Sequence, residues 1–556
     1  MNKGKIFSLV SLLVAFSMVL VACGANPTPA AQPAQPAATT QPVAQTAPTA
    51  APAAATKAPA AQAPTAQPAA AKPAGSKILR VRLYGDIKNM DPAFIGSQND
   101  WVVGNTILQG LVTYAPNSYE VVNELADSME TSKDGLTITF KLKQGIQWPK
   151  GYGEVSADDV KFSYERIADP ALKSPYADDW AALDHVEVLD KYSGKIILKK
   201  PFAPLWHSTL PVTSGKILPK KYLQEVGNEK FATNIIGTGP YMLVDWKPKQ
   251  EVVVKRNPDY KGTPPAWDEI HFIPIEDDKT AEIALEAGEL DFSRIAIASI
   301  DRFQNNPNFQ LIKKPSLRYR WIGMNVENPK LKDINVRLAI RYAIDVPSIV
   351  KVAYMGQADQ EYTLIPPGLV GYWKDAPHFD RDLAKAKDYM AKAGLKTLDL
   401  RMDIQDTSEY RAWAEIAQQN LKEIGINLSI NPMDSSSFWS IGDGDKGKDV
   451  ELYGMSFSMQ PDPSWAAMWF TCNQIGVWNW QRWCSKDYDA LYQKGLSSTD
   501  DKERQQIFVD MEKIWNDAAH SIWITHGVYA YAAAPAIKAA VTPHGDPQVQ
   551  YFTPAK

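Results

Sequence analysis

The most constraining feature of this 556-residue chain is a change of composition near residue 77. The segment from Pro27 to Ser76 contains eleven prolines, no acidic or aromatic residue, and only two charged residues, Lys57 and Lys72. Such a segment buries too little apolar surface to offset the entropy of ordering it, and its prolines extend it as a spacer. A packed fold is therefore expected from Lys77 onward, over about 480 residues, which is enough for two or three cores.

The 22 residues at the N-terminus are typical of a secretory signal peptide, because two lysines precede an apolar run from Ile6 to Ala22. A transmembrane helix is the alternative, but the run is short and no basic cluster follows it. Leu20-Val21-Ala22-Cys23 resembles the lipobox of bacterial lipoproteins. This resemblance implies that Cys23 carries a lipid, and that residues 23–76 link the outer face of the cell membrane to the folded part.

The charge of the folded part argues against a nucleic-acid partner. All 63 acidic residues, but only 55 of the 59 basic ones, lie from Lys77 onward, and no basic tract interrupts them. Nucleic-acid binding requires a concentrated positive surface. We therefore expect a partner of another kind.

Two cysteines remain in the folded part, Cys472 and Cys484, on either side of a turn-like stretch. In an oxidising compartment a disulfide is the natural interpretation. Two unpaired core thiols are the alternative. A zinc site is a weaker one, because no histidine is near in the sequence.

Periodicity predicts both strands and helices. Alternation predicts strands over 78–83 and 137–142, and helical spacing predicts a helix that begins after Ser156, with acidic residues in its first turn. In the second half, helices over 382–393 and 414–424 each end at a glycine, and a strand from Ile426 follows the second at once. Helix, glycine and strand in direct succession indicate α/β construction.

Several stretches between Leu79 and Pro535 resemble family 5 of the extracellular solute-binding proteins, which serve ABC importers of peptides and nickel. The resemblance rests on short motifs that occur in the family's order. They are Asn89-Met90-Asp91-Pro92-Ala93, residues 134–148 (DGLTITFKLKQGIQW), residues 156–160 (SADDV), residues 237–241 (GTGPY), residues 256–260 (RNPDY) and residues 335–345 (NVRLAIRYAID).

The resemblance implies an α/β, two-lobed periplasmic-binding-protein (Venus flytrap) fold with an extra subdomain in the first lobe. We expect the first lobe over 77–325, with the subdomain inserted at about 122–234. The second lobe is expected over 326–535, and residues 536–556 should return to the first lobe. Ligand would bind between the lobes, and the closed form would dock on a membrane permease.

Peptide-binding members of the family hold the peptide's α-ammonium with an acid shortly before a "DP" pair. Here Met459 stands at that position, before Asp462-Pro463. A thioether cannot compensate an ammonium charge. Asp462 could take the role from three positions along, or it could be a turn residue.

Tryptophan supplies a second indication about the ligand. The chain has 17 Trp, as many as Phe, and Trp478 and Trp480 share one face if their segment is extended. Indole pairs stack on sugar faces or close over cations, although many tryptophans only fill cores. An oligopeptide or peptide-like solute is the leading ligand, and a carbohydrate oligomer or other neutral solute is the alternative.

The candidate ligand-binding residues come from these patterns and from the family resemblance. They are Asn89, Trp321, Ser458, Met459, Gln460, Asp462, Trp478 and Trp480. Arg337 is a further candidate for a carboxylate contact or for a structural ion pair.

No metal, cofactor or catalytic residue is expected. The seven histidines are scattered, and the closest pair, His520 and His526, has neither helical nor usual ligand spacing. A nickel carrier is therefore disfavoured. A secreted glycosidase that acts through two carboxylates is the alternative from another class of function. We expect a monomer, lipid-anchored outside the cytoplasm, that partners with ABC permease subunits.

Overall fold

The computed structural model describes residues 77–555. The predicted signal peptide, Cys23 and the spacer lie outside the described residues. Among the helices that are described, none combines the length and the hydrophobicity needed to cross a membrane.

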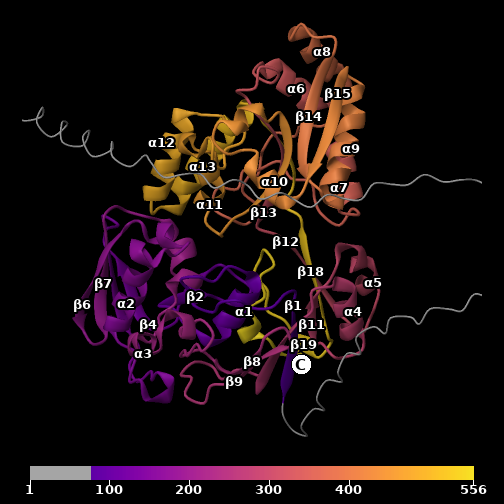
Figure 1. The fold of residues 1–556 in the computed structure, drawn as a ribbon. Coiled ribbons are helices and arrows are strands. Elements are labelled where there is room, and N and C mark those ends of the chain that lie inside the picture. Colours follow the sequence, from indigo (N-terminus) through magenta and orange to yellow (C-terminus); the bar gives the residue numbers. More distant parts are fainter. Residues whose placement is uncertain (1–76, 556) are drawn as a thin grey trace, which may run out of the picture. The chain divides into compact units, whose positions relative to one another are not determined.

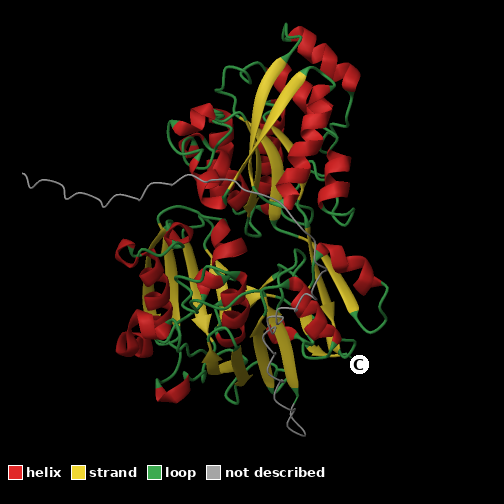
Figure 2. Ribbon diagram, turned by 45° about the vertical axis from the view of Figure 1, so that its right-hand side comes forward, coloured by secondary structure: helices red, strands yellow, loops and turns green. Residues whose placement is uncertain are grey.

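The first lobe is built on a seven-stranded sheet with β1 near its centre (Figures 1 and 2). β1 is parallel to β10 on one side and to β11 on the other. In sheet order the strands are β12 (Gln310–Pro315), β18 (Val528–Ala533), β11 (Phe292–Arg294), β1 (Ile78–Leu83), β10 (Glu269–Pro274), β9 (Glu251–Arg256) and β8 (Tyr241–Lys247). The remaining elements of this part are α1 (Gln98–Ile107), α3 (Lys220–Phe231), α4 (Asp278–Glu286), α5 (Ile300–Gln304), and the strand pairs β2 (Val112–Tyr114) with β3 (Val121–Asn123) and β19 (Ile537–Lys538) with β20 (Thr553–Pro554).

A smaller antiparallel sheet forms a separate core inside the predicted insertion. Its strands, in order, are β4 (Ala126–Thr131), β5 (Thr137–Leu142), β7 (Ser193–Leu198) and β6 (Leu183–Asp190). Helix α2 (Ala157–Ala168) packs against it through Val160, Tyr164 and Ile167. Ser156 caps this helix in a reciprocal capping box with Asp159, which confirms the predicted helix start.

The second lobe is built on a five-stranded sheet with helices on both faces. Its strands, in order, are β15 (Ile426–Met433), β14 (Leu398–Gln405), β16 (Leu452–Ser458), β13 (Arg318–Met324) and β17 (Ser521–Thr525). Its helices are α6 (Ile334–Ala343), α7 (Val346–Ala353), α8 (Leu383–Lys392), α9 (Ser408–Lys422), α10 (Ser435–Ser440), α11 (Ser464–Ala467), α12 (Lys486–Ser497) and α13 (Asp501–Asp517).

The two faces of this second sheet differ in chemistry because side chains alternate along each strand. On β13, Ile322 joins an aliphatic core with α6 to α9, whereas Trp321 points into an aromatic core with α10 to α13. On β17, Ile522 likewise joins the aliphatic core and Trp523 joins the aromatic core. The tryptophan content of the sequence is therefore concentrated on the face that leads to the loop after β16.

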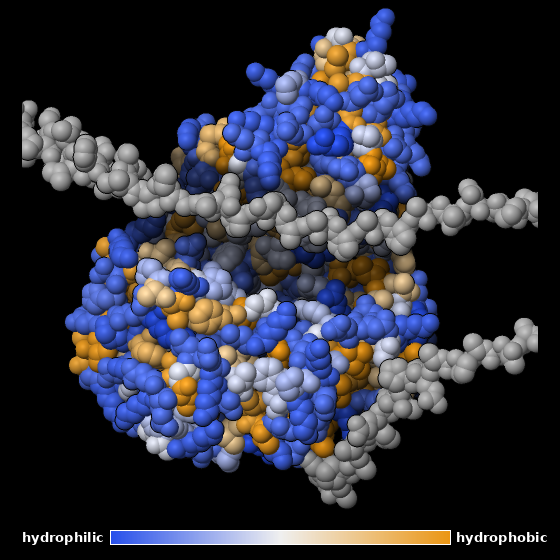
Figure 3. Space-filling model, viewed as in Figure 1, coloured by the Kyte–Doolittle hydropathy of each residue, from blue (hydrophilic) through white to orange (hydrophobic). Residues whose placement is uncertain are grey.

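The chain crosses between the two sheets at two adjacent short links, 316–317 and 526–527. The Ser316 hydroxyl donates to the His526 carbonyl, and Arg320 Nη1 donates to the same oxygen at 2.8 Å. Gly527 has a φ of 72°, and a Cβ there would lie 2.3 Å from Arg320 Nη1, so the second link requires glycine. Figure 3 shows the surface hollowed between the lobes that these links join.

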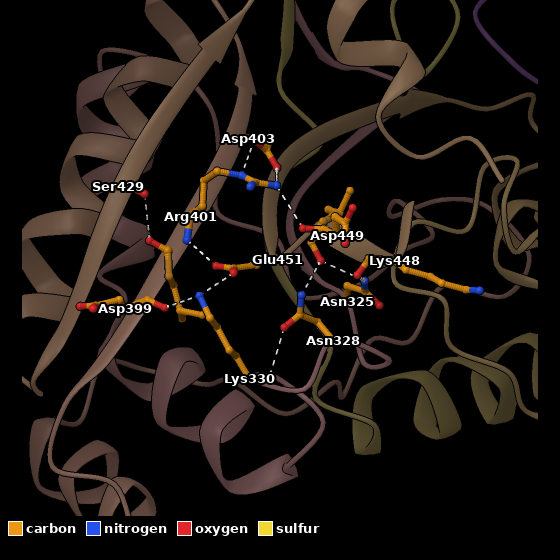
Figure 4. A network of polar contacts seen from close by, with 12 residues as sticks. Asn325, Asn328, Lys330, Asp399, Arg401, Asp403, Ser429, Lys448, Asp449 and Glu451 are labelled. Carbon is orange, nitrogen blue, oxygen red and sulfur yellow. Dashed lines mark hydrogen bonds and ion pairs between the residues drawn. The ribbon is translucent and has the colours of Figure 1, made fainter. Parts of the chain in front are cut away.

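A polar network fixes the end of β13 to the neighbouring strands (Figure 4). Glu451 accepts from Lys330 Nζ at 2.7 Å and from the Arg401 backbone N–H at 2.6 Å. Asn325 Nδ2 donates to three carbonyls of residues 447–450. These contacts satisfy buried polar groups and set the register of β16, whose far end leads to the candidate site.

The lobe boundaries differ from those expected. β13 was assigned to the first lobe but lies in the second sheet, and β18 was assigned to the second lobe but lies in the first sheet. Alternation predicts that a segment is a strand but does not say which sheet it joins. Residues 536–555 pack on the core of the first lobe through Val541, Val549 and Phe552, as expected for a returning segment.

Candidate functional site

The loop after β16 lies directly at the crossing between the lobes. Ser458, the last residue of β16, pairs with Arg318, the first residue of β13. The next backbone N–H, of Met459, donates to the Leu317 carbonyl at 2.8 Å. The sequence-predicted loop is thus held against one of the two links.

Two cavities meet at Ser458. The first, here called the tyrosine pocket, has a volume of about 380 Å³ and walls from both lobes and from the returning segment. Its lining residues are Tyr84, Ile95, Gly96, Ser97, Gln98, Trp101, Tyr114, Tyr119, Tyr176, Val212, Leu317, Ser458, Met459, Gln460, Pro461, Tyr529, Thr542, His544 and Asp546. Its lining is largely aromatic and polar, and it contains a single acid, Asp546.

The second cavity, here called the tryptophan pocket, has a volume of about 460 Å³ and walls from the second lobe alone. Its lining residues are Arg318, Trp439, Ser456, Phe457, Ser458, Trp469 and Trp478. The Trp478 ring meets those of Trp439 and Trp469 edge to face, with centroids 6.1 and 5.9 Å away. The exposed Arg318 guanidinium forms no ion pair with the residues that the structure describes.

The loop that carries Trp478 is closed by the disulfide between Cys472 and Cys484, which confirms the predicted pairing. Inside the loop the fully buried Asn479 amide donates to the carbonyls of Phe470, Thr471 and Trp483. Trp480 is buried against Phe438 and Tyr453. The Trp478 ring is therefore presented to the pocket by a cross-linked and internally bonded loop.

Asp462 is held in the protein interior. Its Oδ2 accepts from Arg504 Nη2 at 2.7 Å, and both side chains are 0% exposed. Its Oδ1 accepts from the Ser464 N–H at 2.9 Å, which starts α11. Asp462 is thus the turn residue that the sequence allowed, and its charge is compensated by Arg504.

The structure divides the predicted site residues into two groups. Ser458, Met459 and Gln460 line the tyrosine pocket, and Ser458 and Trp478 line the tryptophan pocket. Asn89, Trp321, Asp462 and Trp480 line neither of them. Asn89 accepts from the Asp91 N–H in a turn, and Trp321 is buried in the aromatic core.

Arg337 also has a structural role. Its guanidinium donates to the carbonyls of Leu331, Lys332 and Ala518. These contacts join the start of α6 to the end of α13. The predicted structural ion pair is not formed among the described residues, where the Arg337 guanidinium is bonded to these carbonyls instead.

The electrostatics of the tyrosine pocket centre on Asp546. Gln98 Nε2 donates to Asp546 Oδ1 at 2.7 Å, and burial raises the pKa of the carboxyl to about 6. Burial also lowers the pKa of His544 to about 4, so this ring is neutral near pH 7. The His544 Nε2–H donates to the Pro367 carbonyl at 3.1 Å, which joins the returning segment to the second lobe.

Sequence reasoning missed most of the tyrosine pocket. Tyr114, Tyr119, His544 and Asp546 belong to no motif, and they come from segments more than 400 positions apart. The one available signal was the expected return of residues 536–556 to the first lobe. Within residues 77–555, no group of three or more His, Cys, Asp or Glu is arranged to hold a metal ion.

The comparisons with known proteins agree with this architecture. Residues 120–477 match the sequence profile of the bacterial extracellular solute-binding proteins, family 5 (middle region). The dipeptide-binding protein of Escherichia coli is 27% identical over 447 residues, which cover 75% of this chain and 83% of that protein. The glutathione-binding protein GsiB of Escherichia coli is 27% identical over 463 residues, which cover 81% of this chain and 88% of that protein.

A solved structure shows the same fold. HbpA2 from Haemophilus parasuis superposes with a TM-score of 0.79 and 23% identity, over 86% of this chain and 100% of that one. The fold is the α/β two-lobed fold of periplasmic binding proteins, and the chain belongs to family 5 of the bacterial extracellular solute-binding proteins. It is a transport protein that binds a solute and is not an enzyme.

Proposed function

We propose that this protein captures a small peptide or peptide-like solute between its two lobes and delivers it to the permease of an ABC importer. The observation that carries the proposal is the pair of cavities that meet at Ser458, where the chain crosses between lobes. Their volumes lie within the range of small-ligand sites. The peptide class is supported by the dipeptide and glutathione that the relatives' names specify.

The polarity of the two cavities suits a peptide. A carboxylate lines the tyrosine pocket, a guanidinium lines the tryptophan pocket, and an apolar aromatic wall lies beside the guanidinium. A short peptide offers a cation, an anion and apolar side chains. Ser458, Met459, Gln460 and Trp478 are the predicted residues that we retain as ligand contacts.

A carbohydrate oligomer is the second candidate, and one observation favours it. The three indoles of Trp439, Trp469 and Trp478 offer aromatic faces within one cavity, as sugar-binding sites do. A neutral sugar has no cation to pair with Asp546, the half-buried acid of the tyrosine pocket. For this reason we rank the peptide first.

We further propose that residues 1–22 are a signal peptide, and that lipid on Cys23 anchors the protein through the spacer of residues 23–76. A tethered binding protein would stay at high effective concentration beside a permease in the same membrane. Replacing Cys23 with Ser should release the protein into the medium of a bacterial culture. Retention of Cys23→Ser at the membrane would reject the lipid anchor.

The ligand class can be tested by thermal unfolding of the purified intact protein with di- to tetrapeptide mixtures and with cello-oligosaccharides. A ligand that binds only the folded state raises the unfolding temperature as its concentration exceeds Kd. Peptides should raise it and sugars should not. Stabilisation by the sugars alone would favour the second candidate.

A further inference from the structure

The tyrosine pocket contains a carboxylate without a cation. Asp546 Oδ1 accepts from Gln98 Nε2 at 2.7 Å, and none of the cationic side chains among residues 77–555 forms an ion pair with Asp546. Its backbone is fixed by Thr542, whose hydroxyl accepts from the Asp546 N–H at 2.9 Å. A desolvated carboxylate is unfavourable unless a cation or several donors compensate it.

The second acid near the loop after β16 is not available for a ligand. Asp462 is fully buried and its carboxylate is occupied by Arg504 and by the Ser464 N–H. Met459, which lines the pocket, has no charge. Asp546 is therefore the acid that a cationic ligand group would meet on entering this pocket.

The surroundings of Asp546 also suit a cation. Tyr84, Tyr119 and Tyr529 line the same pocket, and aromatic faces attract ammonium groups. Burial raises the pKa of Tyr84, Tyr114, Tyr119 and Tyr531, and the charge of the nearby Asp546 raises it further. Arg294 already lies over one face of Tyr84 and one face of Tyr529, with its guanidinium carbon 5.7 and 4.7 Å from the two centroids.

We propose that Asp546, carried by the returning segment at the C-terminal end of the chain, binds the ammonium group of the ligand in this protein. The inference rests on the proposed function and adds to it the orientation of the bound ligand. The ammonium end lies in the tyrosine pocket, the chain passes Ser458, and a large apolar side chain enters the tryptophan pocket. The substrate class is then a short peptide with a free amino group and an adjoining aromatic or large aliphatic side chain.

The test uses calorimetric titration of the intact protein with four probes. They are the tripeptide Ala-Phe-Ala, its N-acetylated form, N-acetyl-Lys-Phe-Ala and cellotriose. The variant Asp546→Asn keeps the size of the side chain and an oxygen for Gln98 but removes the charge. Glu289→Gln, an exposed acid in the turn before β11, is the matched control.

We expect Ala-Phe-Ala to bind the parent and the Glu289→Gln variant equally, and to bind Asp546→Asn at least about 30-fold more weakly. N-acetylation should cause a similar loss in the parent. If N-acetyl-Lys-Phe-Ala binds the parent and loses affinity in Asp546→Asn, the ammonium of a lysine side chain occupies the same place, which also supports the assignment.

Equal binding of Ala-Phe-Ala to the parent and to Asp546→Asn would overturn the role of Asp546 and leave peptide capture intact. Binding of cellotriose, with none of the peptides, would overturn both. The unfolding temperature without ligand gives a separate readout. Asp546→Asn should unfold at the same or a higher temperature, and a lower one would show that the carboxylate is already compensated, contrary to the proposal.

Discussion

The two cavities that meet at Ser458 differ in which parts of the chain build their walls. The tryptophan pocket is made by the second lobe alone, on a loop closed by the disulfide. The tyrosine pocket takes its walls from both lobes and from the returning segment. A movement of one lobe relative to the other would leave the tryptophan pocket intact and separate the walls of the tyrosine pocket. In the proposed capture, the tryptophan pocket would receive a ligand before the lobes close, and closure would complete the tyrosine pocket.

The acids near the two cavities show the same contrast. Asp462 is compensated within the second lobe by Arg504, whereas among residues 77–555 the Asp546 carboxylate is bonded to the Gln98 amide and forms no ion pair. One carboxylate stabilises the fold, and the other is positioned to stabilise a complex. The following predictions test this difference, from the largest expected effect to the smallest.

Asp462→Asn should lower the free energy of unfolding by about 3–5 kcal/mol, because it leaves the fully buried Arg504 guanidinium without its counter-charge. Urea denaturation of the intact protein measures this change. Adding Arg504→Met to Asp462→Asn should recover most of the loss, since the uncompensated charge is then removed. A single variant that unfolds like the parent would show that the pair does not stabilise the second lobe.

Loss of the disulfide should cost about 3 kcal/mol on the chain-entropy model for a loop of this size. The double variant Cys472→Ser and Cys484→Ser should also weaken ligand binding, because Trp478 lies within the closed loop. Urea denaturation and calorimetric titration separate the two effects. Unchanged affinity in the destabilised variant would mean that the hydrogen bonds of Asn479 hold Trp478 in place without the disulfide.

Trp478→Ala should weaken binding of a peptide with a large apolar side chain by about 2 kcal/mol, through lost contact in the tryptophan pocket. Binding of a triglycine probe should change little, since it places no side chain there. Trp373→Ala is the matched tryptophan control, because Trp373 is half-buried and lines neither cavity. Equal effects of Trp478→Ala on both probes would contradict a side-chain role for this pocket.

These residues also show how far the sequence could predict the site. Ser458, Met459 and Gln460 were found because a motif marks the loop, and Trp478 because paired tryptophans are uncommon. Trp480 carried the same signal and Trp321 was a further candidate, but both fill the aromatic core. Composition cannot separate an indole that lines a cavity from one that packs beside it, because the difference is set by sheet register and loop closure.

The fold was more predictable than the site for a physical reason. β1 and β5 have the predicted bounds, since alternation and turns are local signals. The lobe to which β13 or β18 belongs depends on pairing between distant strands. Asp546 and Gln98 are 448 positions apart in the sequence, and no local sequence pattern predicts the hydrogen bond between them.

The smallest predicted effect is a pH dependence of binding. In the unliganded protein burial raises the pKa of Asp546 to about 6. An ammonium ligand binds the ionised form, so protonation competes with binding as the pH falls through 6. The affinity for Ala-Phe-Ala should be greatest near pH 7 and weaken by about tenfold at pH 5. It should also weaken by about twofold at pH 8, because the α-amino group of the peptide has a pKa of about 8 and loses its proton. His544 and Tyr84 should each keep one protonation state over this range, because burial lowers the pKa of His544 to about 4 and raises the pKa of Tyr84 above its usual value.

Asp179, beside Tyr176, is the other acid near the pocket that titrates here, since burial raises its pKa to about 7. Asp179→Asn should keep the parent's loss of affinity below pH 7, and Asp546→Asn should abolish it. Calorimetric titrations from pH 5 to pH 8 provide the measurement. If the profile instead disappears in Asp179→Asn and persists in Asp546→Asn, the titrating acid belongs to the wall of the inserted subdomain. The acid that controls binding in the tyrosine pocket would then be Asp179, and not Asp546 of the returning segment.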